Sequence, residues 1–139
     1  MPTIEKIVQD LDDTSSKIGE ITRTISLSAL ALVWLFIAGG DDSPSLPIKP
    51  GNELLLLSGA FALLSLLADY FQYVVGYANS KDVLTVAEAA EAKSAKYNTD
   101  SFLYKLRTFF FWSKQVLALV SLVLLFIAIG GAYFSCKIT

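Results

Sequence analysis

The 139-residue sequence contains no histidine, a single cysteine and few charged residues, which excludes several kinds of site. Without imidazole ligands and with one thiol, most zinc sites and all histidine-based catalysis are excluded. Cys136 has no second cysteine to pair with in the chain, so an intrachain disulfide is also excluded. The formal net charge of −2 lacks the dense basic surface of a nucleic-acid binder. We therefore expect no metal, no cofactor and no nucleic-acid partner.

Catalytic motifs are missing as well. The sequence has no glycine-rich phosphate loop and no nucleophile–base pair. Glu88 and Glu91 lie in an alanine-rich segment that is typical of a solvated helix face, not of an acid–base pair. We expect no catalytic residues and no enzymatic activity, and an intramembrane enzyme is the last of three hypotheses.

Apolar residues dominate the composition of the chain. They make up 54% of the chain against 17% charged residues, and the mean hydropathy is +0.55. The excess falls in three runs, and a helix needs about 20 apolar residues to cross a bilayer. The sequence predicts one membrane domain over 1–139, an all-α fold with three transmembrane helices at 24–39, 53–77 and 111–134. Because a long acidic segment precedes the first run, we expect a retained span and not a cleaved signal peptide.

The N-terminal segment 3–23 has the pattern of an amphipathic cytoplasmic helix. Its apolar residues recur at three- and four-residue steps and are Ile4, Ile7, Val8, Leu11, Ile18, Ile21 and Ile25. Packing against the protein's own cytoplasmic helices is the favoured placement, and an interfacial anchor or an oligomerisation surface are the alternatives. The acidic polar face argues against an anchor on anionic lipid. The helix enters the first span without an obvious break, although Thr14 to Ser16 can mark a bend.

Small and polar residues form a stripe on each predicted span. On the first span the stripe is Thr24, Ser28, Ala31 and Ala38, which we expect to face the second span while Arg23 extends toward water. On the second span it is Ser58, Ala62, Ser65, Asp69, Gln72 and Gly76, and on the third it is Lys114, Ala118, Ser121, Ala128 and Ala132.

Asp69 makes the second stripe a candidate site. A carboxylate is costly in hydrocarbon unless it faces a packed interior, a partner or water. The candidate intramembrane polar site consists of Asp69, Gln72, Ser65, Ser58 and Lys114. In the functional interpretation Lys114 bends inward to pair with Asp69, and the polar face holds helices together or lines a water-filled path. In the alternative, Asp69 faces the headgroups on a tilted helix and Lys114 extends away from it.

Two connections complete the plan. Residues 40–52 are rich in proline and glycine and predict an external loop. Residues 81–110 predict a cytoplasmic helical hairpin with strong helix formers. There we expect a kink near Asn79 and Ser80, a new helix capped by Thr85, and a last helix that begins at Thr99 or Asp100.

Basic residues predict the orientation. Most of them precede the first span or lie between the second and third spans: Lys6, Lys17, Arg23, Lys81, Lys93, Lys96, Lys105, Arg107 and Lys114. Only Lys49 and Lys137 lie on the other side. The positive-inside rule then places the N-terminus in the cytoplasm and the C-terminus outside.

The segment Leu66-Leu67-Ala68-Asp69-Tyr70-Phe71-Gln72-Tyr73-Val74-Val75-Gly76-Tyr77 resembles the Asp-x-x-Gln-Tyr helix of small bacterial inner-membrane proteins. The overall plan is also similar to that of the small transmembrane effectors of bacterial antiviral defence, including the two-span SLATT type. A third span departs from the SLATT pattern. The resemblance implies oligomerisation in the inner membrane and loss of membrane integrity when a cytoplasmic sensor triggers it, with no catalytic residues.

Two functions stay open at this stage. The first is a self-associating, pore-forming or membrane-disrupting effector, in which Ser65, Asp69 and Gln72 line or close a polar path in a homo-oligomer. The alternative is a non-conducting accessory or immunity-type subunit, which docks a cytoplasmic protein partner on 81–107.

Overall fold

The computed structural model describes residues 4–38, 52–89 and 99–138. These residues form three helices, α1 (Ile4–Ala38), α2 (Asn52–Ala89) and α3 (Phe102–Ile138), with no strand in the described ranges. The all-α prediction is confirmed. Most of the loop predicted at 40–52, the tip of the 81–110 hairpin and the Cys136 side chain lie outside what the structure describes, and Asn52 already belongs to α2.

Each helix is long and apolar enough to cross a bilayer. The candidate spans lie within Asp12–Ala38, Glu53–Val86 and Phe102–Phe134. The helices contain 35, 38 and 37 residues. At 1.5 Å per residue they are about 52–57 Å long, against a hydrocarbon core of about 30 Å. The chain is therefore a multi-pass membrane protein whose helices extend beyond the hydrocarbon.

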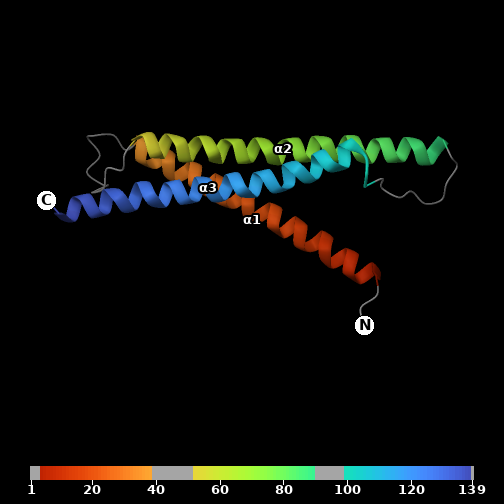
Figure 1. The fold of residues 1–139 in the computed structure, drawn as a ribbon, viewed down its shortest axis with the longest axis horizontal. Coiled ribbons are helices and arrows are strands. Elements are labelled where there is room, and N and C mark those ends of the chain that lie inside the picture. Colours follow the sequence, from red (N-terminus) through yellow and green to blue (C-terminus); the bar gives the residue numbers. More distant parts are fainter. Residues whose placement is uncertain (1–3, 39–51, 90–98, 139) are drawn as a thin grey trace.

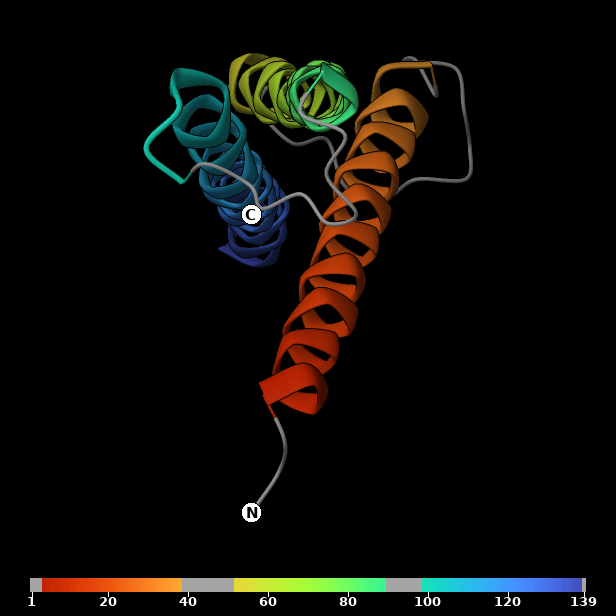
Figure 2. The same cartoon turned by 90° about the vertical axis from the view of Figure 1, so that its right-hand side faces the viewer.

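α2 and α3 run antiparallel and lie side by side, and α1 crosses them at an angle (Figure 1). The C-terminal half of α1 packs on the other two helices, whereas its N-terminal half leaves the bundle (Figures 1 and 2). The bundle therefore has three helices over only part of its length.

Small residues let the helices approach closely. The buried apolar cluster joins all three helices and consists of Ala29, Val33, Leu55, Ala62, Leu125 and Ala128. Gly59 on α2 lies so near Val33 that an added Cβ would be 3.2 Å from Val33 Cγ1. Because hydrocarbon gives apolar residues little reason to leave lipid, close van der Waals packing of this kind holds membrane helices together.

The stripes predicted on the second and third spans face the bundle interior. Every member of the α2 stripe is buried or half-buried, and the same holds for the α3 stripe. Antiparallel packing therefore brings the two polar faces together.

The stripe predicted on the first span is wrong. Thr24, Ser28, Ala31 and Ala38 are all exposed. The face of α1 that packs on the bundle carries Gly19, Thr22, Ser26, Ala29 and Val33 instead. Both sets contain small residues at helical spacing, so residue size alone did not distinguish the two faces.

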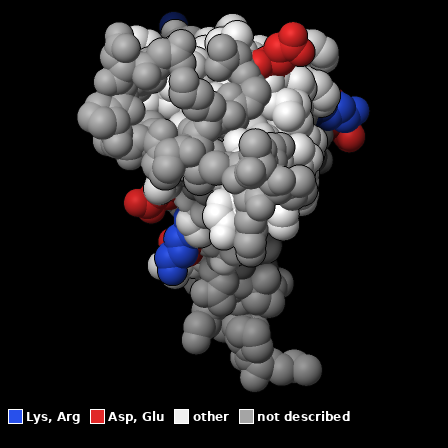
Figure 3. Space-filling model, turned by 90° about the vertical axis from the view of Figure 1, so that its left-hand side faces the viewer, with Lys and Arg blue, Asp and Glu red and all other residues white. Residues whose placement is uncertain are grey.

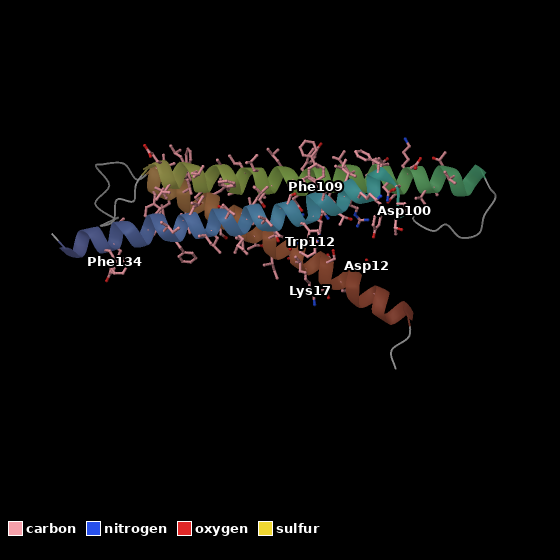
Figure 4. All side chains as sticks on the ribbon, viewed as in Figure 1. Asp12, Lys17, Asp100, Phe109, Trp112 and Phe134 are labelled. Carbon is pink, nitrogen blue, oxygen red and sulfur yellow. The ribbon has the colours of Figure 1, made fainter. Side chains whose placement is uncertain are left out.

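The favoured placement of the N-terminal helix is also wrong for the side chains that are described. Every side chain from Asp12 to Ile18 is exposed, and Asp12 and Lys17 lie on the part of α1 that has left the bundle (Figure 4). We call the segment Ile4–Ile18 the arm. It does not pack on α2 or α3 over those side chains, and α1 continues through Thr14 to Ser16 without a break.

Helix boundaries differ from the predictions in two places. α2 passes through Asn79 and Ser80 without a kink, and the Thr85 hydroxyl donates to the carbonyl of Lys81 inside the same helix. α3 begins after Ser101, whose hydroxyl accepts a bond from the backbone N–H of Tyr104 at 3.2 Å. Ser101 is thus the N-cap in place of Thr99 or Asp100.

The end of the molecule where the C-terminus lies has a largely uncharged described surface. Isolated acidic and basic side chains are visible among uncharged ones when this end faces the viewer (Figure 3). Exposed tryptophan, tyrosine and leucine side chains along the helices, such as Trp34, Leu56 and Tyr133, are typical of a surface that meets lipid.

Candidate functional site

Asp69 connects all three helices through its two carboxylate oxygens. Lys114 on α3 places its Nζ 2.5 Å from Oδ1. Arg23 on α1 donates from Nε and Nη2 to Oδ2, at 3.0 and 2.8 Å. Asp69 itself is 7% exposed. The predicted pair of Asp69 and Lys114 is present, and the alternative in which the two side chains diverge is not observed.

Lys114 is the most enclosed charge of the three. The residue is 2% exposed, and its ammonium lies 5.6 Å from the centre of the Phe111 ring. A Cβ added at Gly19 of α1 would lie 3.2 Å from Nζ, so a glycine at this position leaves room for the ammonium. Removing one partner of such a buried pair leaves the other charge uncompensated, which typically costs about 3–5 kcal/mol.

Arg23 is the member of the site that the sequence interpretation missed. We expected it to extend toward water, and its side chain is indeed 43% exposed, but its guanidinium folds onto α2. There Nη2 also donates to the Tyr73 hydroxyl at 3.0 Å, and the guanidinium carbon lies 5.6 Å from the centre of the Tyr73 ring.

A signal for this contact exists in the sequence. Arg23 lies 15 residues before the end of α1, and Asp69 lies 16 residues after Glu53, near the start of α2. At 1.5 Å per residue both are about 22–24 Å from the loop that joins the two helices. Antiparallel neighbours therefore bring the two charges to the same depth, about 6–8 Å inside one edge of a 30 Å core.

Two serines connect α2 and α3 nearer the end of the bundle where α2 begins. Ser58 donates its hydroxyl to the backbone carbonyl of Ser121, and Ser121 donates to the carbonyl of Ser58, both at 2.8 Å. Both residues are fully buried. A reciprocal bond of this kind requires the two backbones to be close, which only small residues allow.

Ser65 contacts both neighbouring helices close to the ion pairs. Its hydroxyl donates to the backbone carbonyl of Lys114 at 2.8 Å. Ser26 on α1 lies with its hydroxyl 3.0 Å from both the Ser65 hydroxyl and the Thr22 carbonyl, and can donate to one of them at a time. The polar stripe of α2 thus contacts both neighbouring helices.

Gln72 stands apart from this network. It is half-buried, and its Oε1 has no hydrogen-bond partner. Two further buried amide nitrogens, Asn79 Nδ2 and Gln115 Nε2, also lack a partner. Of the five predicted site residues, Asp69, Lys114 and Ser65 belong to one network. Ser58 forms a separate contact with Ser121, and Gln72 belongs to neither.

The geometry limits the chemistry of this site. Among the residues that the structure describes, no cluster of three or more histidine, cysteine, aspartate or glutamate side chains could hold a metal. The one carboxylate of the network, that of Asp69, is bonded to the cations Lys114 and Arg23 through its two oxygens. Each serine hydroxyl donates to a carbonyl or to another serine, not to a general base. The arrangement is suited to holding three helices together.

Comparison with known proteins adds no relative to this picture. No family model, no curated protein and no solved structure matches the chain.

Proposed function

We propose that the chain is a self-associating subunit of the bacterial inner membrane, which disrupts or opens that membrane as an effector of antiviral defence. The observation that carries the self-association is the outer surface of α1. Its arm leaves the bundle, and its small-residue stripe is exposed in place of being covered by α2. The bacterial inner membrane is supported by the resemblance of residues 66–77, and the defence role by the similarity of the overall plan to small transmembrane effectors. The proposal includes no enzymatic activity.

The proposed orientation is a cytoplasmic N-terminus and an external C-terminus. It is supported by the distribution of basic residues along the described helices. Only Lys137 lies near the C-terminal end of α3, and the others lie at or beyond the level of the Asp69 network on the side of the arm: Lys6, Lys17, Arg23, Lys81, Lys105, Arg107 and Lys114. In this orientation the arm and the far end of α2 lie in the cytoplasm.

Any conducting path in this proposal runs between copies of the chain and not through one bundle. Ser65 and Asp69 are buried and bonded to the chain's own helices. They therefore differ from pore-lining residues, which present free polar groups to water. Three helices are in any case too few to enclose a path. The residues that line the conducting path would come from surfaces that are exposed in a single copy of the chain.

A second function is favoured by the exposed end of α2. Beyond the Asp69 network this helix continues for another 20 residues to Ala89, and Leu84 and Val86 are exposed on it. Large apolar side chains outside the hydrocarbon are typical of a protein-docking surface. In this alternative the chain is a non-conducting accessory subunit whose partner binds within 81–107.

The test compares membrane potential, growth and particle mass in bacteria that produce the wild type at several induced levels. Depolarisation that rises with the level of an oligomeric protein would support the effector. A strictly monomeric protein in mild detergent would refute self-association. An oligomer that leaves potential and growth unchanged, alone and after phage challenge, would replace the effector with the docking subunit.

The variant Asp69→Asn distinguishes a conducting path between copies of the chain from a path through a single bundle. If the path lies between copies, this variant lowers depolarisation only in proportion to its loss of folded protein. A fully folded Asp69→Asn protein with altered ion selectivity would place Asp69 in the path and contradict the proposal.

A further inference from the structure

α1 uses one narrow face to pack within its own bundle. The residues of this face are buried and follow one another at alternating steps of three and four, namely Gly19, Thr22, Ser26, Ala29 and Val33. Such a repeat of seven residues keeps one side of a helix against its neighbours. The remaining circumference of α1 is available for other contacts.

A second line with the same seven-residue repeat runs along the whole helix, about 100° around from the first. We call it the α1 seam, and it consists of Ile4, Ile7, Leu11, Thr14, Ile18, Ile21, Ile25, Ser28, Leu32 and Leu35. In heptad notation these are the a and d positions of five successive heptads. Eight of the ten residues are isoleucine or leucine and none is charged. Sustained a and d apolar positions over three to four heptads are typical of a coiled coil.

The seam is largely uncovered in the single chain from Thr14 to Leu35, the part whose side chains the structure describes. Ile21 is 58% and Leu35 is 53% exposed, and Ile18, Ser28 and Leu32 are exposed as well. The charges of the same stretch, Asp12, Asp13, Lys17, Glu20 and Arg23, all lie at other heptad positions. Two copies of the seam can therefore meet without placing like charges opposite one another.

We propose that α1 forms a parallel coiled coil with the α1 helices of further copies of this chain, with the seam as its core. The inference rests on the proposed self-association and names the surface that produces it. Copies inserted in the same membrane have the same orientation, so their α1 helices are parallel and in register. A strict seven-residue repeat gives the assembly a left-handed supercoil.

The residue types and the area indicate three or more strands. Isoleucine at both a and d positions favours trimers and tetramers over dimers. A strip about 52 Å long and about 10 Å wide offers about 500 Å² on each partner, below the roughly 800 Å² of a standard interface. In a trimer or larger assembly each helix contacts two neighbours, and its total buried area exceeds that of a standard interface. In a dimer it does not.

The arm provides the driving force, because covering exposed apolar surface such as Ile18, which is 37% exposed, removes it from water. Within hydrocarbon the same leucines gain little by leaving lipid. There the exposed residues Thr24, Ser28 and Ala31, which lie on or beside the seam, permit close approach of the backbones. Thr14 and Ser28 are the polar d positions, and a polar residue in a seam selects register at some cost in stability.

A membrane surface is a poorer occupant of the arm. The arm is continuous with the spanning part of α1, so it cannot lie flat in the interface without breaking the helix. Its polar side also carries Asp12 and Asp13, with Glu20 about two turns further, which anionic headgroups repel.

Cysteine cross-linking in native membranes tests the seam directly. In a Cys136→Ser background, Ile18→Cys and Ile21→Cys are compared with Ser16→Cys and Glu20→Cys, which are exposed positions off the seam. A parallel, in-register coil brings equivalent seam residues within the Cα separation of about 4.4–6.8 Å that a disulfide requires. We expect cross-linked dimers at 18 and 21 under mild oxidation and at least tenfold less at 16 and 20.

Particle mass in mild detergent provides the second measurement, on Ile18→Asp and its matched control Ser16→Asp. A charge in the seam should raise the dissociation constant at least 100-fold, while Ser16→Asp stays a trimer or larger. Since both positions lie outside the bundle, both variants should keep the helical content of the wild type, measured by circular dichroism. The Ile18→Asp protein loses only the stability that assembly adds.

Three results would overturn the inference in distinguishable ways. A monomeric wild-type protein would refute self-association, and with it the proposed function. An oligomer that survives Ile18→Asp, or that cross-links equally at 16 and 18, self-associates through another surface. A dimeric wild type contradicts the strand number.

Discussion

Ser58 on α2 and Ser121 on α3 donate their hydroxyl groups to each other's backbone carbonyl, both at 2.8 Å. The two helices therefore approach at this point as closely as their side chains permit, and the contact depends on size more than on polarity. Hydrogen bonds between membrane helices contribute about 0.6 kcal/mol on average.

Enlarging either serine should destabilise the bundle more than removing its hydroxyl. We expect Ser58→Ala to lower the free energy of unfolding by about 1 kcal/mol or less, and Ser58→Leu by about 2–3 kcal/mol because the added carbons have no space. Unfolding in mixed micelles by a denaturing detergent measures both. Leu57→Ala, at an exposed neighbour, is the control and should change little. Equal losses in the two Ser58 variants would argue against close packing.

Asp69 and Lys114 should be energetically coupled. Asp69→Asn leaves the buried ammonium of Lys114 without its anion and should cost about 3–5 kcal/mol. In Asp69→Asn with Lys114→Met the loss should be smaller than in Asp69→Asn alone, since the orphaned charge is gone. A double-mutant cycle on detergent unfolding measures this. Simple additivity of the two single changes would contradict the geometry.

Arg23 should contribute less than Lys114. Its side chain is 43% exposed, and its loss leaves Asp69 paired with Lys114. We expect Arg23→Gln to cost about 1 kcal/mol, after allowance for screening by water and headgroups. Arg23→Lys should recover only part of this, because an ammonium cannot bond both Asp69 and Tyr73 with the planar geometry of a guanidinium. An Arg23→Lys protein as stable as the wild type would show that charge alone suffices.

Two glycines should respond to alanine in opposite ways. An added Cβ at Gly59 would lie 3.2 Å from Val33, whereas nothing lies within 4 Å at Gly130. Gly59→Ala should destabilise by about 1–2 kcal/mol from overpacking, and Val33→Ala should restore part of the loss. Gly130→Ala should be neutral or stabilising by up to about 1 kcal/mol, the intrinsic gain of alanine in a helix. The comparison requires only the relative unfolding midpoints of the three variants.

Much of the architecture could be predicted because long apolar runs and helical periodicity are local signals. The three spans, the inward faces of α2 and α3 and the pair of Asp69 with Lys114 all follow from such signals. In each case the polar residues lie on one side of a membrane helix, and that side must face the protein interior to avoid lipid.

The errors concern choices between similar local patterns. α1 has small residues on two faces. Its packing on α2 and α3 determines that Ser26 and Ala29 face inward while Ser28 and Ala31 do not. Asn79 and Thr85 have the composition of a kink and a cap, yet α2 continues through both, and the Thr85 hydroxyl donates to the Lys81 carbonyl one turn earlier in the same helix. The short first run indicates the headgroup zone and water for Arg23, while the carboxylate that binds it lies 46 residues away in sequence.

The continuity of α1 from Ile4 to Ala38 has a mechanical consequence. Arg23 lies about midway along this rod, with about 28 Å of helix before it and about 22 Å after it. Because one helix carries both parts, the arm cannot turn without turning the half that packs inside the bundle. A tilt of about 5° around Arg23 would move the two ends by about 2 Å in opposite directions. A force applied to the arm is thus delivered to the contact of Val33 with Gly59, on the other side of the ion pairs.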